Sequence, residues 1–124
     1  MDQSTLVTGG HALVKRLDVA GLRPRLAMWV HNTDTDTWRL WIVPPPGRTD
    51  KREFYRTVAQ ILSKDRAAFG DIDASDTEMI LDTHPAMNGL KKLLRAPDLT
   101  SIHFSGNKFN GFYVPEGIIL RLDL

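Results

Sequence analysis

The chain contains no cysteine, and this absence removes several kinds of site at once. Without a thiol there is no disulfide framework, no cysteine nucleophile and no thiolate metal centre. Apolar runs long enough to span a bilayer are also missing, and Met1–Ser4 lacks the basic and apolar regions of a signal peptide. These absences predict a cytoplasmic protein with no membrane partner.

A strong charge of either sign is missing as well. The 16 basic and 15 acidic residues leave a net charge of +1, which is too small to predict binding to nucleic acid or to an anionic membrane. Of the 124 residues, 42% are apolar and 25% are charged, as in ordinary globular proteins. A chain of this length fits one folded unit, so we predict a single domain over residues 1–124.

What the chain does have is a hairpin pattern at Arg25–Pro44, which carries all three tryptophans. Its two strands are largely apolar on both faces, whereas a strand with one face in water alternates apolar and polar residues. A symmetric register around the polar turn pairs Trp29 with Leu40 and Met28 with Trp41. We therefore predict two central strands of a sheet that is covered on both sides, with Trp29 and Trp41 buried.

Three helices are predicted around this hairpin. The first covers about His11–Ala20, because Gly9–Gly10 weakens an earlier start. The second, Lys51–Lys64, follows a capping-box pattern of aspartate and glutamate and has one apolar stripe. The third begins at Pro85, which suits the first turn of a helix, and ends before Pro97.

Three more strands are expected, at Met79–Asp82, Ser101–Ser105 and Gly111–Leu124. The order α-β-β-α-β-α-β-β predicts a single α+β domain, with helices packed on a mixed sheet of about five strands. The short spacing between the third and fourth strands permits them to pair in parallel, in which case their connection would be right-handed.

Turn signals divide the C-terminal strands. Gly106–Asn107 and Asn110–Gly111 are both turn signals, and Asn-Gly favours a tight hairpin turn. Pro115–Gly117 predicts a bend or bulge. After it, Ile118–Leu124 alternates apolar with partly polar residues, which indicates a strand near an edge of the sheet.

Several short motifs resemble a group of small bacterial proteins to which no activity is attached. The resemblance covers most of the chain after the first helix and implies no catalytic residue and no cofactor. The motifs are Ala27–Val30, Trp38–Ile42, Phe54–Arg56, Phe104–Asn107 and Asn110–Val114.

Candidate metal and catalytic residues are scattered. His31, Asp34 and Asp36 would converge on a divalent ion only if the turn curled back, and aspartates in turns mostly bond their own backbone. The acidic loop Asp71–Asp82 has oxygen-bearing residues at calcium-loop spacing but lacks the glycine that such a loop needs. The histidines show no zinc-ligand spacing, and no serine lies in a nucleophile elbow. We predict no metal, no cofactor and no catalytic residue.

Basic residues suggest one alternative function. If the second and third predicted helices lay on the same face of the sheet, their basic side chains would form a positive ridge that phosphates could follow. These residues are Lys51, Arg52, Arg56, Lys91, Lys92 and Arg95.

The leading hypothesis is a non-enzymatic module that binds another protein or itself, in an accessory or regulatory role. It rests on the predicted edge strand, which would pair with another chain through Ile119, Arg121 and Asp123. The other alternative is a small enzyme built on His31 with Asp34 and Asp36, or on His84 with the acidic loop, because catalytic groups need to meet only in space.

Overall fold

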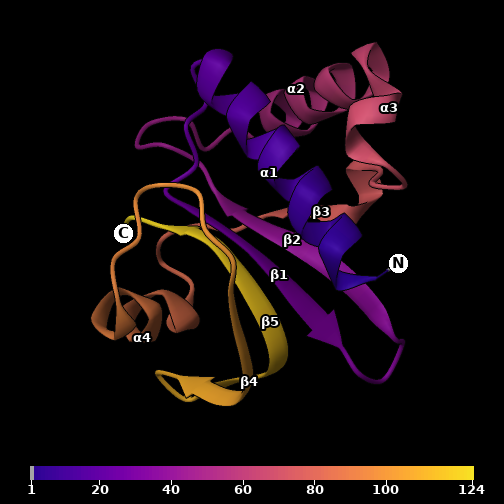
Figure 1. Ribbon diagram of the computed structural model, residues 1–124. Helices are drawn as coiled ribbons and strands as arrows, with labels where there is room; N and C mark the ends of the chain where they lie inside the picture. The colour runs from indigo at the N-terminus through magenta and orange to yellow at the C-terminus, as the bar shows by residue number, and fades with distance from the viewer. Residues whose placement is uncertain (1) are drawn as a thin grey trace.

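The computed structural model describes residues 2–124 as an α+β domain built on a five-stranded mixed sheet (Figure 1), which confirms the predicted fold class. The strands lie in the order β3-β2-β1-β5-β4, and neighbours are antiparallel except for the parallel pair β2 and β3. The elements are α1 (Gln3–Val19), β1 (Leu26–Asn32), β2 (Thr37–Val43), α2 (Lys51–Lys64), α3 (Arg66–Phe69), a 3₁₀ turn (Ala74–Asp76), β3 (Thr77–Met79), α4 (Pro85–Leu93), β4 (Ile102–Phe109) and β5 (Phe112–Leu122).

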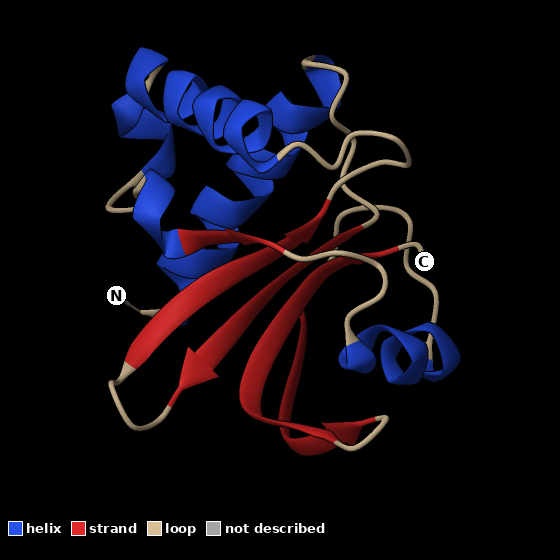
Figure 2. Ribbon diagram, turned by 180° about the vertical axis from the view of Figure 1, so that it is seen from behind, coloured by secondary structure: helices blue, strands red, loops and turns tan. Residues whose placement is uncertain are grey.

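Helices cover both faces of the sheet. Helices α1, α2 and α3 lie together on one face, and α4 lies alone on the other (Figure 2). Each face has its own buried apolar cluster, and the strands contribute alternate side chains to the two clusters. We call these two sides the α1 face and the α4 face.

The tryptophan-rich hairpin forms the centre of the sheet, as predicted. Strands β1 and β2 pair Trp29 with Leu40 and Met28 with Trp41. Trp29 enters the cluster on the α1 face, whereas Met28 and Trp41 enter the cluster on the α4 face. Trp29 is fully buried and Trp41 is 7% exposed, so the prediction that both are buried is confirmed. The third tryptophan, Trp38, is half-buried.

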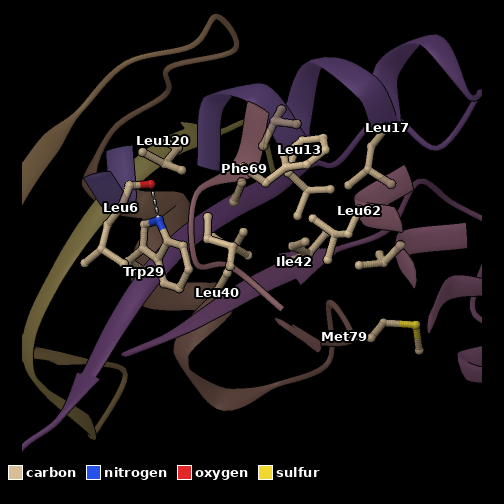
Figure 3. Close-up of a cluster of buried hydrophobic side chains, with 14 of the residues drawn as sticks. Leu6, Leu13, Leu17, Trp29, Leu40, Ile42, Leu62, Phe69, Met79 and Leu120 are labelled. Atoms are coloured by element: carbon tan, nitrogen blue, oxygen red, sulfur yellow. Dashed lines mark hydrogen bonds between the residues drawn. The ribbon is translucent and has the colours of Figure 1, made fainter. Parts of the chain in front are cut away.

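Figure 3 shows the core on the α1 face. Leu6, Leu13 and Leu17 of α1 pack on strand residues that include Trp29 and Leu40. The indole Nε1 of Trp29 donates a hydrogen bond to the carbonyl oxygen of Leu6, at 2.9 Å. A buried indole needs such an acceptor, so this bond removes the cost of burying the polar end of the ring.

Helix α1 begins earlier than the sequence predicted. Asp2 caps it by accepting a hydrogen bond from the backbone N–H of Thr5, at 2.8 Å. Gly9 and Gly10 lie inside the helix, where a Cβ at Gly9 would lie 2.5 Å from Ile72 Cδ1 and a Cβ at Gly10 would lie equally close to a leucine side chain on β5. The two glycines therefore allow α1 to approach its neighbours closely, and this packing outweighs their poor helix propensity.

The parallel strand pair differs from the prediction. Strand β3 covers Thr77–Met79, two residues earlier than expected, and pairs with β2 rather than with the fourth strand. The connection between β2 and β3 runs through α2 and α3, which pack on the α1 face. The parallel pairing of the third and fourth strands, which the sequence permitted, does not occur, because β3 and β4 lie at opposite edges of the sheet.

The β4–β5 hairpin is longer than predicted and turns over along its length. The turn lies at Asn110–Gly111, where both residues have positive φ, whereas Gly106 and Pro115–Gly117 lie within the paired strands. Val114 and Ile119 both enter the cluster on the α4 face. Residues five apart on a regular strand face opposite sides, so β5 must change faces between them.

This reversal brings the tip of the hairpin onto α4 (Figure 1). Phe109 is buried there, and the backbone of β4 passes so close to the helix that a Cβ at Gly89 would lie 2.6 Å from Phe109 Cα. The hairpin and α4 together cover one part of the α4 face, and an open groove remains beside them.

Candidate functional site

The residues predicted to form a protein-binding edge do not lie at an edge. Strand β5 lies between β1 and β4, so the expected edge position of Ile118–Leu124 is wrong. Ile119 is fully buried, and Arg121 is 5% exposed. Asp123 accepts hydrogen bonds from Arg23 and Arg95, which lower the pKa of its carboxyl, Arg95 more strongly. The partly polar pattern of Ile118–Leu124 therefore reflects the buried Arg121 rather than a face of the strand in contact with solvent.

The predicted basic ridge does not form. The apolar side of α2 packs in the cluster on the α1 face, and that of α4 packs in the cluster on the α4 face. The sheet therefore separates Lys51, Arg52 and Arg56 from Lys91 and Lys92 (Figure 1). The last member, Arg95, follows α4 and pairs with Asp123 at 3.0 Å.

His31 lies between two carboxylates. Its Nε2 lies 2.8 Å from Asp36 Oδ1, and its Nδ1 lies 3.4 Å from Glu116 Oε2. The ring stacks on Trp38 with a centroid separation of 4.6 Å. Because the carboxylates approach opposite nitrogens of one ring, they do not surround a common point. Within residues 2–124, no group of three or more histidine, aspartate and glutamate side chains is arranged to hold a metal ion.

The carboxylates of the acidic loop do not converge on a common site either. Asp73 and Asp76 bond each other's backbone in a capping box around the 3₁₀ turn, with Asp76 Oδ2 accepting from the Asp73 N–H at 2.9 Å. In the β1–β2 turn the same role falls to Asn32, whose side-chain Oδ1 accepts a hydrogen bond from the backbone N–H of Asp34 at 3.0 Å. These residues stabilise their own turns, as aspartate and asparagine commonly do.

The two edges of the sheet are different. Strand β3 has three residues, and the backbone N–H of Met79 donates to Tyr55 Oη at 3.0 Å. Tyr55, from α2, therefore satisfies a polar group of this short edge. Strand β4 has eight residues, and within the described chain β5 is the only strand that its backbone pairs with, although the Ser105 carbonyl oxygen also accepts a hydrogen bond from Asn107 Nδ2 at 3.3 Å. The unprotected edge is therefore β4, the strand beside the one that the sequence suggested.

A hollow of about 250 Å³ lies beside this edge, on its polar side. His103, Phe104 and Ser105 of β4 line it together with Gln3 and Glu116. Gln3 Nε2 donates to Glu116 Oε1 at 2.9 Å, which ties the start of α1 to β5. The side chains of His103 and Ser105 are exposed. If another strand paired with β4, one of its side chains could enter this hollow.

A larger groove, of about 470 Å³, lies on the α4 face. It is bounded by the start of β5 and by the outer part of β2 and β3, and the loop 32–34 closes one end. Trp41 lies in its floor, and Phe112 and Tyr113 form one wall. Arg39 and Glu78 carry the charges beside Trp41, and Asp34 adds a second carboxylate where the loop closes the groove.

The ring of His84 packs against two aromatic residues that line the groove. Its ring lies 5.1 Å from that of Trp41 and 4.8 Å from that of Phe112, in edge contacts. Its Nδ1 accepts a hydrogen bond from the Ala86 N–H at 3.1 Å, capping α4. Burial lowers the pKa of His84, while the charge of Glu78 opposes the shift. The alternative of an enzyme site built on His84 and the acidic loop therefore has little geometric support: His84 caps α4, and Glu78 is the acidic residue whose charge acts on it.

Sequence reasoning missed three features of these surfaces. Tyr55 gave no signal, because its hydroxyl meets β3 only through the fold. Gly106 was interpreted as a turn, although glycine within a strand also marks a bulge or an irregular backbone. Arg39 and Glu78 belong to separate segments, and only the pairing of Trp41 with Glu78 brings them to one face.

Comparison with known proteins does not narrow the function, since no family model, curated protein or solved structure matches the chain. Among residues 2–124, every helix is too short or too polar to cross a membrane. The function is therefore argued from the geometry of the two surfaces.

Proposed function

We propose that this protein is a non-catalytic binding module that adds an extended segment of another protein to its sheet at β4. The carrying observation is the contrast between the two edges. Tyr55 bonds the outward N–H of Met79 on β3, whereas the eight-residue β4 pairs with no second strand, and no backbone N–H of β4 donates to a side chain among the residues described. An added strand gains main-chain hydrogen bonds, and pockets beside the edge select its side chains.

The surroundings of β4 support this assignment. Ile102 and Phe104 are half-buried and give an incoming strand apolar contact, while the hollow lined by Glu116 receives a side chain on the other face. Strand β4 carries Lys108 and no acidic residue. An acidic side chain opposite Lys108 would complement its charge, so the occupant that we propose is a neutral or acidic segment of another protein.

Hydrogen exchange tests the edge directly. In the free protein, outward backbone amides of β4 around His103 and Ser105 should exchange much faster than the Met79 amide, which is bonded to Tyr55. Tyr55→Phe is the matched control, because it should speed exchange at Met79 and leave β4 unchanged.

Peptides selected from a displayed random library then test the function. Selected peptides should protect β4 amides from exchange, and Ser105→Pro should weaken their binding while thermal unfolding shows that the variant is folded. Proline removes a backbone donor, so it blocks strand addition. If the selected peptides bind without protecting any β4 amide, the proposal is wrong.

A further inference from the structure

The groove on the α4 face forms a second binding surface, separate from the outer edge of β4. We infer that it binds a small aromatic zwitterion, a molecule of the amino-acid class with one ring, one ammonium and one carboxylate. Its volume of about 470 Å³ lies within the range of small-molecule sites in proteins. The inference does not depend on strand addition at β4.

The aromatic part of the groove is held rigidly before any ligand arrives. The Trp41 and Phe112 rings are 5.7 Å apart, and His84 contacts both rings from behind. His84 is itself fixed by the hydrogen bond that it accepts at the start of α4. Tyr113 adds a ring that lines the groove and is 55% exposed. A flat ring is the ligand group that such a surface fits.

The charges indicate what the ring carries. Of the three glutamates in the chain, Glu53 pairs with Arg48 and Glu116 accepts from Gln3. Glu78 is half-buried, yet its side chain makes no hydrogen bond or ion pair within the part of the chain that the structure describes. A carboxylate in that position has acceptor capacity for an ammonium group.

Arg39 supplies the opposite charge. It lies two residues before Trp41 on β2, so both side chains are on the same face, and Trp41 is the strand partner of Glu78 on β3. Arg39 is exposed and makes no ion pair with Glu78 or with any other residue from 2 to 124. Arg39 and Glu78 border the aromatic floor without pairing with each other, so together they complement the two charges of a zwitterion, while the further carboxylate of Asp34 lies at the loop end of the groove. The guanidinium suits a carboxylate, which it binds through two parallel hydrogen bonds.

Three related compounds test the inference in NMR titrations of the full chain, read at the Trp41 indole N–H and the amides of Phe112 and Tyr113. The probes are L-phenylalanine, 3-phenylpropionate (which lacks the ammonium) and 2-phenylethylamine (which lacks the carboxylate). We expect saturable shifts with L-phenylalanine and about tenfold weaker binding of each analogue, because each loses a charged hydrogen bond. Equal affinity of all three compounds, or the absence of saturable shifts at millimolar concentration, would overturn the inference.

Two charge variants separate the roles. Arg39→Gln should weaken binding of L-phenylalanine and 3-phenylpropionate and leave that of 2-phenylethylamine unchanged. Glu78→Gln should weaken L-phenylalanine and 2-phenylethylamine and spare 3-phenylpropionate. Arg52→Gln, on α2 across the sheet, is the matched control and should change none of them. Unchanged denaturant midpoints establish that each variant is folded, and a loss of the same size for every probe in either groove variant would contradict the assigned roles.

Discussion

Arg121 is a charged residue that the fold places in the interior. Its guanidinium donates to both carboxylate oxygens of Asp18, at 2.8 and 2.9 Å, and its Nε donates to the carbonyl oxygen of Pro97 at 2.8 Å. The Arg121 side chain is 7% exposed and that of Asp18 is 31% exposed. The bonds join β5 to the end of α1 and to the segment before β4, so this one side chain ties together three separate parts of the chain.

Replacing Arg121 tests this structural role. Arg121→Met should lower the free energy of unfolding by about 3 kcal/mol, because it leaves the Asp18 carboxylate without its ion-pair partner and removes a donor from the Pro97 carbonyl oxygen. Arg95→Met is the matched control, since Arg95 is 74% exposed and its pair with Asp123 contributes at most about 1 kcal/mol. Urea unfolding measures both. A similar small loss for the two variants would show that Arg121 is not held in the interior.

Helix α4 depends on its first turn, where the neutral ring of His84 accepts the Ala86 N–H. Protonation of the ring would remove that acceptor. Burial lowers the pKa of His84 below its ordinary value of 6.5. The unfolded chain therefore binds more protons than the folded protein between the two pKa values, and stability falls as the pH is lowered through that window. Below the folded pKa the loss is complete and the dependence levels off.

Two variants check this pH dependence by urea unfolding between about pH 8 and pH 5. His84→Asn keeps an acceptor for the helix cap but does not titrate, so its stability should fall less than that of the wild type. Glu78→Gln removes the charge that raises the pKa of His84, so the fall should be larger than in the wild type. Curves of the same shape for all three proteins would rule out His84 as the titrating group.

Elements whose signals are local were the ones that the sequence predicted well. Helix α2 has the predicted bounds Lys51–Lys64, because its cap and its apolar stripe both lie within the segment. The start of α1 was missed because the value of Gly9 and Gly10 depends on side chains far along the chain. The reversal of the β4–β5 hairpin was missed for a related reason, since it depends on the close packing of Phe109 against Gly89 of α4, which no local pattern encodes.

At the scale of the whole molecule, the sequence established the two covered faces but not the positions of the edges. The apolar pattern of β1 and β2 required cover on both sides, and both sides are covered. Which strands lie outermost depends on long-range pairing, and there the half-polar pattern of β5 was misleading because Arg121 is paired inside. The candidate sites could not be predicted for the same reason: Glu78 and Arg39 border one groove only because α2 and α3 return the chain so that β3 pairs with β2.

The two clusters share the β1–β2 hairpin, so the molecule should unfold as one unit even though the sheet separates them. Trp29 and Trp41 lie on adjacent strands and face opposite clusters, which allows each face to be tested through one tryptophan. Trp29→Ala and Trp41→Ala should each cost about 3–5 kcal/mol, because each removes a large side chain from a buried cluster.

Trp38→Ala should cost less than either change, since Trp38 is only half-buried and packs on His31 near the turn. Far-UV circular dichroism and tryptophan fluorescence, followed in the same urea titration, should give coincident transitions in the wild type and in each variant. Because β1 and β2 contribute to both clusters, losing either cluster removes support from the strands that carry the other. A variant in which one probe reports its unfolding transition at a much lower urea concentration than the other would show that the two faces are independently stable.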